Sequence, residues 1–141
     1  MDFSLSEDQI AIQDTARRFA ADRLAPDYQK RENEGGFDRG LLREMGGLGL
    51  IGICLPEEYG GLEQDALTTG VVIEAIAGGD FNVSYIQLIS NLLGTIVAEH
   101  GQPHVAAEVV PKLCAGEELI ALGLTEPGGG SYAANLTVKA R

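Results

Sequence analysis

The sequence contains no tryptophan, and it has only two cysteines, Cys54 and Cys114, and two histidines in 141 residues. Two cysteines do not make a disulfide framework, and the histidines lack metal-ligand spacing, so we expect no metal site. Basic residues are also few, ten against 21 acidic ones, which gives a formal net charge of −11. An acidic chain without a local basic stripe repels a phosphate backbone, so nucleic-acid binding is excluded.

Export and membrane signals are absent as well. The N-terminus lacks the basic start and apolar run of a signal peptide. The longest largely apolar stretch that we identify, residues 45–56, is about a dozen residues long and rich in glycine, against the roughly 20 that a spanning helix needs. We therefore expect no membrane span and a cytoplasmic location, or the mitochondrial matrix if the source is eukaryotic.

Hydrophobic residues make up 45% of the chain, enough for a real core, and glycine occupies 19 positions. Most of the chain has helical periodicity. Ser6 and Gln9 form a capping box before the first helix, and Asp38, Asp65 and Asp80 are placed to cap later ones. The pattern predicts helices at residues 6–25, 38–45, 65–77, 80–93, 94–101 and 103–116, a solvated helix or loop at 27–34, and a loop at 48–61.

The periodicity changes near residue 118. Residues 119–124 form a short apolar run, residues 127–131 have turn chemistry, and residues 136–139 alternate like a strand. The sequence thus predicts a mainly α fold: an orthogonal-type bundle of about six helices over residues 1–117, followed by the first strands of a β domain over residues 118–141. A lone strand or hairpin is marginal by itself, so we expect this β domain to be incomplete.

Four patterns that suggest chemistry have simpler explanations. Residues 47–52 match G-x-G-x-x-G, but a predicted helix precedes them and Pro56 prevents a phosphate-binding helix from opening after them. The second pattern is a pair of neighbouring carboxylates in a Pro-Glu-Glu-Tyr-Gly-Gly loop, which is typical of a solvated turn. The third is the pair of histidines, which we expect at the surface. The fourth is a cysteine on an apolar helix face, which we expect to be a small core residue. These last three patterns are Glu57 with Glu58, His100 with His104, and Cys114.

The segment Leu124–Ser131 leaves two interpretations open. Four of its eight residues are glycine or proline in one run, and hydroxyl side chains stand on both sides of that run. Backbone N–H groups in such a loop can cradle the electron-rich edge of a ligand. Turn residues alone explain the composition equally well, and on local sequence a plain hairpin turn is favoured.

Several motifs occur along the whole chain in the order typical of one family. They are LSEDQ at residues 5–9, FA at 19–20 with LAP at 24–26, GLIG at 49–52, PEEYGG at 56–61, PKL at 111–113 with GE at 116–117, and LTEPG at 124–128 with GS at 130–131. The chain resembles the N-terminal part of the acyl-CoA dehydrogenases, FAD enzymes that oxidise the α,β bond of acyl-CoA thioesters. The ordered match favours a ligand-binding loop over a plain hairpin turn.

The resemblance implies that residues 122–131 lie along the flavin, with Leu122, Leu124, Thr125, Gly130 and Ser131 binding the cofactor. Thr125 and nearby backbone groups would donate to the pyrimidine edge of the flavin, where donors stabilise the charge of the reduced ring. Ser131 would also contact the acyl-CoA substrate. In the family a carboxylate base removes the α-proton while the β-hydrogen leaves as hydride to flavin N5. No catalytic residue is assigned, because the base would lie beyond residue 141.

The resemblance also implies a β-barrel as the second domain, an electron-transferring flavoprotein as partner and a homotetramer. One residue departs from the family pattern, since Tyr132 stands where the family usually has aspartate. Two other functions stay open: a flavin-dependent relative with different chemistry, such as a monooxygenase, or a non-catalytic helical module that binds a partner.

Overall fold

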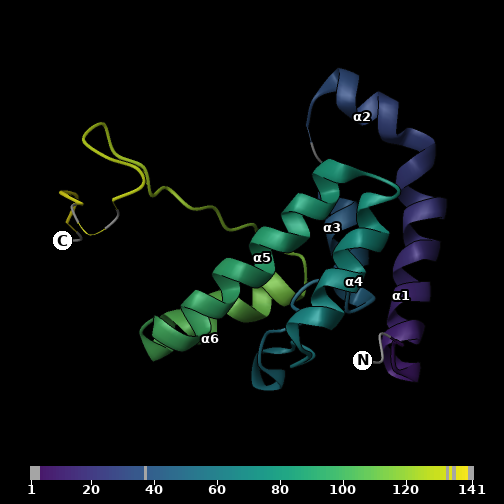
Figure 1. Ribbon diagram of the computed structural model, residues 1–141, viewed down its shortest axis with the longest axis horizontal. Helices are drawn as coiled ribbons and strands as arrows, with labels where there is room; N and C mark the ends of the chain where they lie inside the picture. Colours follow the sequence, from purple (N-terminus) through teal and green to yellow (C-terminus); the bar gives the residue numbers. More distant parts are fainter. Residues whose placement is uncertain (1–3, 37, 133, 135, 140–141) are drawn as a thin grey trace.

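The computed structural model describes residues 4–36, 38–132, 134 and 136–139. The described chain is mainly helical, as predicted, and its last part extends away from the helices as an arm (Figure 1). The elements, in chain order, are α1 (Glu7–Phe19), a π-helical turn (Ala20–Leu24), a 3₁₀ turn (Ala25–Asp27), α2 (Tyr28–Glu34), α3 (Arg39–Gly47), a 3₁₀ turn (Glu57–Tyr59), α4 (Ala66–Ala77), α5 (Phe81–His100) and α6 (Pro103–Cys114).

The predicted helix caps are confirmed. Ser6 and Gln9 exchange the two hydrogen bonds of a capping box at the start of α1. Asp38, Asp65 and Asp80 each accept a hydrogen bond from a backbone N–H in the first turn of α3, α4 and α5. Side-chain caps satisfy N–H groups that have no partner within the helix, which is why the sequence marks these starts clearly.

The core lies where α1, α4 and α5 pack together, with the α3 helix and the following loop beneath them (Figure 1). A second, smaller cluster holds α6 against the loop before α4 and is formed by Leu55, Ala106, Val110 and Cys114. The buried residues of the main cluster are Ala16, Phe19, Ala20, Leu24, Leu41, Leu42, Met45, Leu50, Ile51, Ile53, Val72, Ile76 and Val83.

Helix α5 corrects one prediction. The sequence pattern predicts two helices with a break at Gly94, but the structure has one continuous helix over Phe81–His100. A Cβ at Gly94 would lie 2.8 Å from Leu55 Cδ1, so this glycine permits close packing and does not end the helix. Among the described helices, α5 alone is long and apolar enough to cross a membrane, which corrects the expectation that residues 45–56 are the longest apolar stretch. The core helix of a folded bundle passes the same test.

The predicted strands at residues 119–124 and 136–139 are not observed. The described part of the arm contains no β-strand, only an isolated bridge between Glu126 and Gly129. The backbone N–H groups of Thr137 and Val138 donate to the Glu126 carboxylate and not to a neighbouring strand. A strand needs a strand beside it, and no segment of the described chain forms a backbone ladder with these residues.

Candidate functional site

The five residues predicted to bind a cofactor lie on the exposed arm (Figure 1). The N–H of Glu126 donates to the Gly129 carbonyl and the N–H of Gly129 donates to the Glu126 carbonyl, both at 3.1 Å. This closed turn brings Thr125 and Gly130 together, because a Cβ on Gly130 would lie 3.5 Å from Thr125 Cγ2. Ser131 follows at the same end of the turn, whereas Leu122 lies apart from the turn, nearer the helices.

The arm offers hydrogen-bond donors to a ligand. Within the described chain, the N–H groups of Leu122, Leu124 and Thr125 and the Thr125 hydroxyl have no hydrogen-bond partner. All three residues are exposed. A row of free backbone donors beside a hydroxyl suits the electron-rich edge of a planar ring or an anion.

Glu126 organises the arm in a way that sequence reasoning missed. Its Oε2 accepts from the Thr137 hydroxyl at 2.7 Å and from the Thr137 N–H at 2.9 Å, and its Oε1 accepts from the Val138 N–H at 2.9 Å. These hydrogen bonds lower the pKa of the Glu126 carboxyl below its ordinary value. The bond from the Thr137 hydroxyl has the largest effect, and the bonds from the two N–H groups follow. The turn and the returning chain are therefore tied together by one carboxylate.

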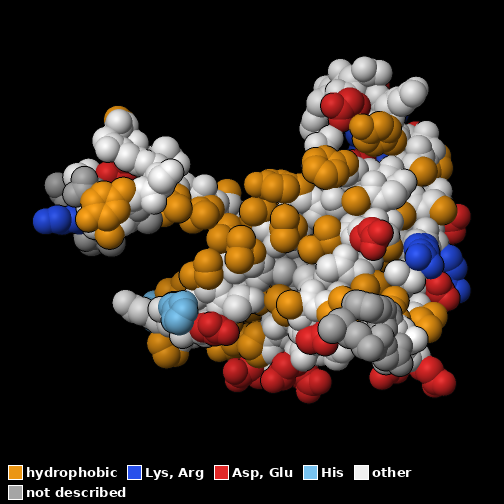
Figure 2. All heavy atoms as spheres, in the orientation of Figure 1, with side chains coloured by type: hydrophobic (Ala, Val, Ile, Leu, Met, Phe, Trp, Pro, Cys, Tyr) orange, Lys and Arg blue, Asp and Glu red, His pale blue; other side chains and the backbone are white. Residues whose placement is uncertain are grey.

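Where the arm leaves the bundle, an apolar groove of about 480 Å³ separates it from α5. Tyr85, Ile86 and Ile89 of α5 line one side, and residues 119–122 line the other. The groove adjoins a row of exposed apolar side chains that we name the outer face of α5 (Figure 2). This outer face consists of Phe81, Tyr85, Leu88, Leu92 and Ile96.

The opposite, buried face of α5 is unusually polar and carries Ser84, Gln87, Ser90 and Asn91. Asn91 Nδ2 donates to the Gln87 carbonyl at 2.9 Å, and Asn91 Oδ1 accepts from the Cys54 N–H at 3.2 Å. The Gln87 side chain is fully buried, and neither of its amide atoms has a partner within the described chain. Helix α5 thus exposes apolar residues and buries polar ones, which predicts that its outer face is covered by something else.

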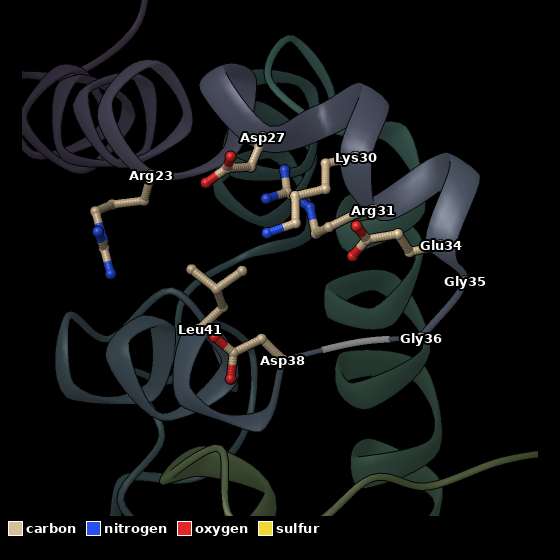
Figure 3. Close-up of a pocket in the computed structure, with 9 residues that line it drawn as sticks. All are labelled: Arg23, Asp27, Lys30, Arg31, Glu34, Gly35, Gly36, Asp38 and Leu41. Carbon is tan, nitrogen blue, oxygen red and sulfur yellow. The ribbon is translucent and has the colours of Figure 1, made fainter.

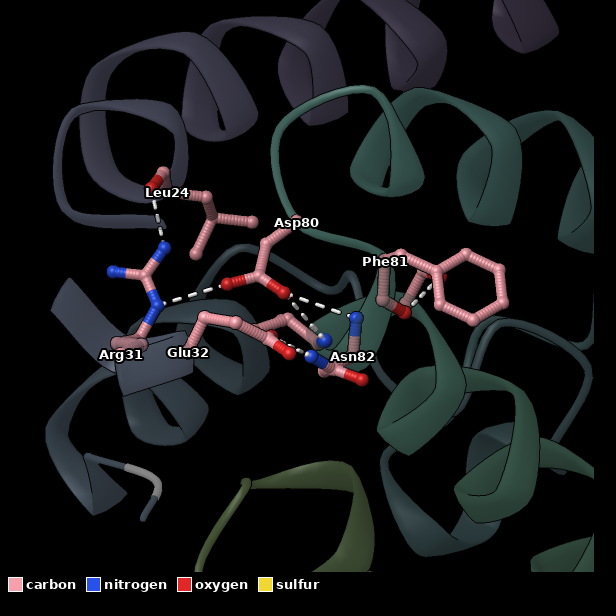
Figure 4. Close-up of polar contacts among 8 residues, drawn as sticks. Leu24, Arg31, Glu32, Asp80, Phe81 and Asn82 are labelled. Atoms are coloured by element: carbon pink, nitrogen blue, oxygen red, sulfur yellow. Dashed lines mark hydrogen bonds and ion pairs between the residues drawn. The ribbon is translucent and has the colours of Figure 1, made fainter. Parts of the chain in front are cut away.

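A buried ion pair fixes the start of α5 (Figure 4). Arg31 Nε donates to Asp80 Oδ2 at 2.9 Å, and the same guanidinium donates to the Leu24 carbonyl. Asp80 Oδ1 accepts from the N–H groups of Asn82 and Val83 at 3.0 and 3.2 Å. The Arg31 and Asp80 side chains are 15% and 3% exposed, so this cluster joins α2 to the turn between α4 and α5.

A cleft of about 360 Å³ between α2 and α3 is lined mainly by charged side chains (Figure 3). It contains three basic residues, Arg23, Lys30 and Arg31, and three acidic residues, Asp27, Glu34 and Asp38. Arg23 is paired with Glu44 at 2.6 Å and Arg31 with Asp80. Because the charges balance, the cleft favours neither an anion nor a cation, and we assign it no ligand.

The structure agrees with the simpler explanations of the four sequence patterns. Residues 47–52 begin at the last residue of α3 and continue into a loop, and no α-helix starts within four residues after them. His100 and His104 are exposed, as are Glu57 and Glu58. Cys114 is buried, and burial raises the pKa of its thiol. Among the described residues, no group of three or more His, Cys, Asp or Glu side chains could hold a metal ion.

Comparison with known proteins decides the family. The family model described as acyl-CoA dehydrogenase, N-terminal domain, matches residues 6–117. The chain belongs to the acyl-CoA dehydrogenase family. The matched residues run from the cap of α1 to just beyond α6, so the described helices constitute this family's N-terminal domain.

Named relatives agree with this assignment. The mitochondrial isobutyryl-CoA dehydrogenase of Dictyostelium discoideum is 33% identical over 136 residues, which is 96% of this chain and 33% of that protein. The glutaryl-CoA dehydrogenase of Mycobacterium smegmatis, solved in complex with FADH2, has a TM-score of 0.85 and 28% identity over 94% of this chain and 34% of that one.

A structure from work on the electron transferring flavoprotein of Acidaminococcus fermentans has a TM-score of 0.87 and 34% identity, covering 96% of this chain and 36% of that one. The present chain therefore spans about a third of the length of the relatives that it matches.

Within this acyl-CoA dehydrogenase domain, the loop at residues 56–61 serves the fold. The N–H groups of Tyr59 and Gly61 both donate to the Pro56 carbonyl at 3.1 Å, and Tyr59 packs against the cluster under α6. A Cβ at Gly61 would lie 2.1 Å from the Leu55 carbonyl oxygen, so only glycine fits there. The PEEYGG motif at residues 56–61 thus contributes to packing, and its two carboxylates face solvent.

Proposed function

We propose that this chain is the N-terminal part of an FAD-dependent acyl-CoA dehydrogenase that oxidises the α,β bond of an acyl-CoA thioester. The observation that carries the proposal is the match of a family's N-terminal domain to residues 6–117, followed directly by an arm with free donors. Two of the relatives named above are dehydrogenases of acyl-CoA thioesters by their names, and one of these two was solved with reduced flavin.

The residues of the arm fit FAD. The free N–H groups of Leu122, Leu124 and Thr125 and the Thr125 hydroxyl would face the pyrimidine edge of the flavin, where fixed donors stabilise negative charge. Gly130 leaves room beside Thr125, and Ser131 would reach both flavin and thioester. When bound, FAD supplies the acceptor for the substrate hydride. The chain's own contribution is to position the ring and to exclude water, and the base that takes the α-proton would lie outside residues 1–141.

The rest of the proposal concerns the whole enzyme. Residues 1–117 would form the helical domain, and residues 118–141 would enter a β-barrel domain in which the arm gains the strand neighbours that it lacks here. Electrons would pass to an electron-transferring flavoprotein, a partner suggested by one solved relative. We further propose a homotetramer in the cytoplasm or the mitochondrial matrix.

Dye reduction tests this function. The full-length polypeptide that contains residues 1–141 should reduce an artificial electron acceptor when given an acyl-CoA. The 141-residue chain alone should not, because the proposed base would lie outside it. Turnover by the isolated chain would contradict this division of the enzyme.

Two results would favour the other candidates. Oxygen consumption coupled to substrate oxidation would favour a monooxygenase-type relative. Absence of flavin from the full-length polypeptide would favour a non-catalytic helical module, for which the exposed outer face of α5 is the structural argument.

A further inference from the structure

Glu126 is the residue at which two parts of the arm meet. Its backbone closes the turn, because its N–H donates to the Gly129 carbonyl and its carbonyl accepts from the Gly129 N–H, both at 3.1 Å. Its side chain reaches the returning chain, where it accepts from the Thr137 hydroxyl at 2.7 Å and from the N–H groups of Thr137 and Val138 at 2.9 Å. One residue therefore fixes both the shape of the turn and its place against residues 137–138.

The chain between Glu126 and Thr137 gains most from such a tie. Glycine occupies three successive positions there, residues 128–130. Glycine has more backbone freedom than any other residue, so ordering this segment costs more conformational entropy. A carboxylate that accepts hydrogen bonds across 11 residues offsets part of this cost, because hydrogen bonds to a charged acceptor are stronger than those between neutral groups. The orientation of the turn thus depends on the Glu126 side chain.

Resting on the function proposed above, we propose that Glu126 is a positioning residue for the flavin site. Thr125 comes directly before it, and the closed turn places Gly130 beside Thr125. By fixing the turn, the Glu126 carboxylate holds the Thr125 hydroxyl and N–H where they meet the pyrimidine edge of the ring. Donors that are fixed in advance stabilise charge on the ring without having to reorganise. Glu126 acts through Thr125, since both of its own oxygens are engaged by Thr137 and Val138.

Calorimetric titration of the full-length polypeptide with FAD, after its flavin has been removed, tests this role. Glu126→Gln keeps the size of the side chain but loses its charge and one acceptor oxygen, and Thr137→Val removes only the hydroxyl donor. We expect each to raise the dissociation constant of FAD about tenfold. Thr137→Ser keeps the hydroxyl and should bind FAD nearly as well as the wild type. Glu57→Gln makes the same change at an exposed position on another loop and should have no effect.

A double variant shows whether the two side chains act together. Glu126→Gln combined with Thr137→Val should bind FAD little more weakly than Glu126→Gln alone, because the effects of removing two hydrogen-bonded partners do not add. Losses that add in full would overturn the inference, since the two side chains would then act separately. If Glu126→Gln does not fold, the pair Thr137→Val and Thr137→Ser decides the question, and equal binding by these two would overturn it.

The two redox states of FAD separate positioning from a general effect on the fold. In Glu126→Gln and Thr137→Val, the loss should be larger for dithionite-reduced FAD than for oxidised FAD, because the Thr125 donors stabilise the charge of the reduced ring. Equal losses for both states, or unchanged binding in both variants, would overturn the inference and leave the proposed function standing. A wild-type polypeptide that binds no FAD would overturn the proposed function itself.

Discussion

The buried amide of Gln87 is a polar group that α5 would be more stable without. Both of its amide atoms lack partners within the described chain, and burying an amide without hydrogen bonds costs free energy. We expect Gln87→Met, which keeps a similar volume, to raise the free energy of unfolding by about 1 kcal/mol in urea denaturation. Asn91→Leu on the same buried face should lower it, because the Cys54 N–H would lose its acceptor. A destabilised Gln87→Met variant would contradict this account.

Asp80 is a buried polar residue of the opposite kind, because both of its carboxylate oxygens accept hydrogen bonds. It pairs with Arg31 and caps α5, and its side chain is 3% exposed. Asp80→Ala should lower the free energy of unfolding by about 3 kcal/mol, because it leaves the Arg31 guanidinium unpaired in a part-buried site. The control Asp14→Ala removes an exposed 4.0 Å pair with Arg17 and should cost less than about 0.5 kcal/mol. Similar losses in the two variants would contradict the role given to Asp80.

Tyr132 is the residue at which the arm departs from the family pattern, and its side chain is 69% exposed. An aspartate there can accept hydrogen bonds from nearby backbone N–H groups and stabilise the turn. We expect Tyr132→Asp in the full-length polypeptide to retain more flavin through dialysis, while Tyr132→Phe should not. Equal flavin content in all three proteins would count against the prediction.

At the scale of elements, the turn of the arm should open in acid. Hydrogen bonds from Thr137 and Val138 hold the pKa of Glu126 below its ordinary value of 4.5. A lowered pKa means that the contact is fully present above the ordinary pKa and is lost as the pH falls through the lowered one. The amide NMR signals of Thr137 and Val138 should therefore move toward unstructured positions only below about pH 4.5. Glu126→Gln should weaken the contact at every pH, whereas Glu57→Gln, at an exposed position on another loop, should leave these signals unchanged.

The elements also show how far the sequence predicts this fold. Helix starts could be predicted because each depends on one capping side chain close in sequence, as at Ser6 and Asp80. The continuity of α5 through Gly94 could not be predicted, because that glycine is required by close packing against Leu55, which lies 39 residues away in the sequence. The local pattern of the arm predicts strands, but strand pairing depends on neighbours that no local pattern contains.

In the candidate site, too, the features set by nearby residues could be predicted and those set by distant partners could not. Thr125 and Gly130 could be placed together from the turn chemistry between them, and the structure does bring them together. The roles of Glu126, Arg31 and Asn91 depend on partners 11 to 49 residues away, and no local signal marks them. The apolar groove could not be predicted, because it lies between α5 and residues 119–122, about 30 residues further along the chain, and no local pattern places these two segments together.

At the scale of the whole molecule, the exposed apolar surface is typical of one part of a larger protein. The outer face of α5 and the leucines of the arm are exposed together, and acidic side chains gather along another edge of the same view (Figure 2). The chain spans about a third of its relatives' length. The proposed function accounts for these surfaces, because flavin, acyl chain and a β domain would cover them.

Anaerobic titration of the full-length protein with an acyl-CoA tests this account most directly. The account predicts that the purified protein has the absorbance bands of oxidised flavin and that an acyl-CoA bleaches them as hydride reaches the ring. A protein without flavin bands, or one whose bands are unaffected by every acyl-CoA tried, would contradict it.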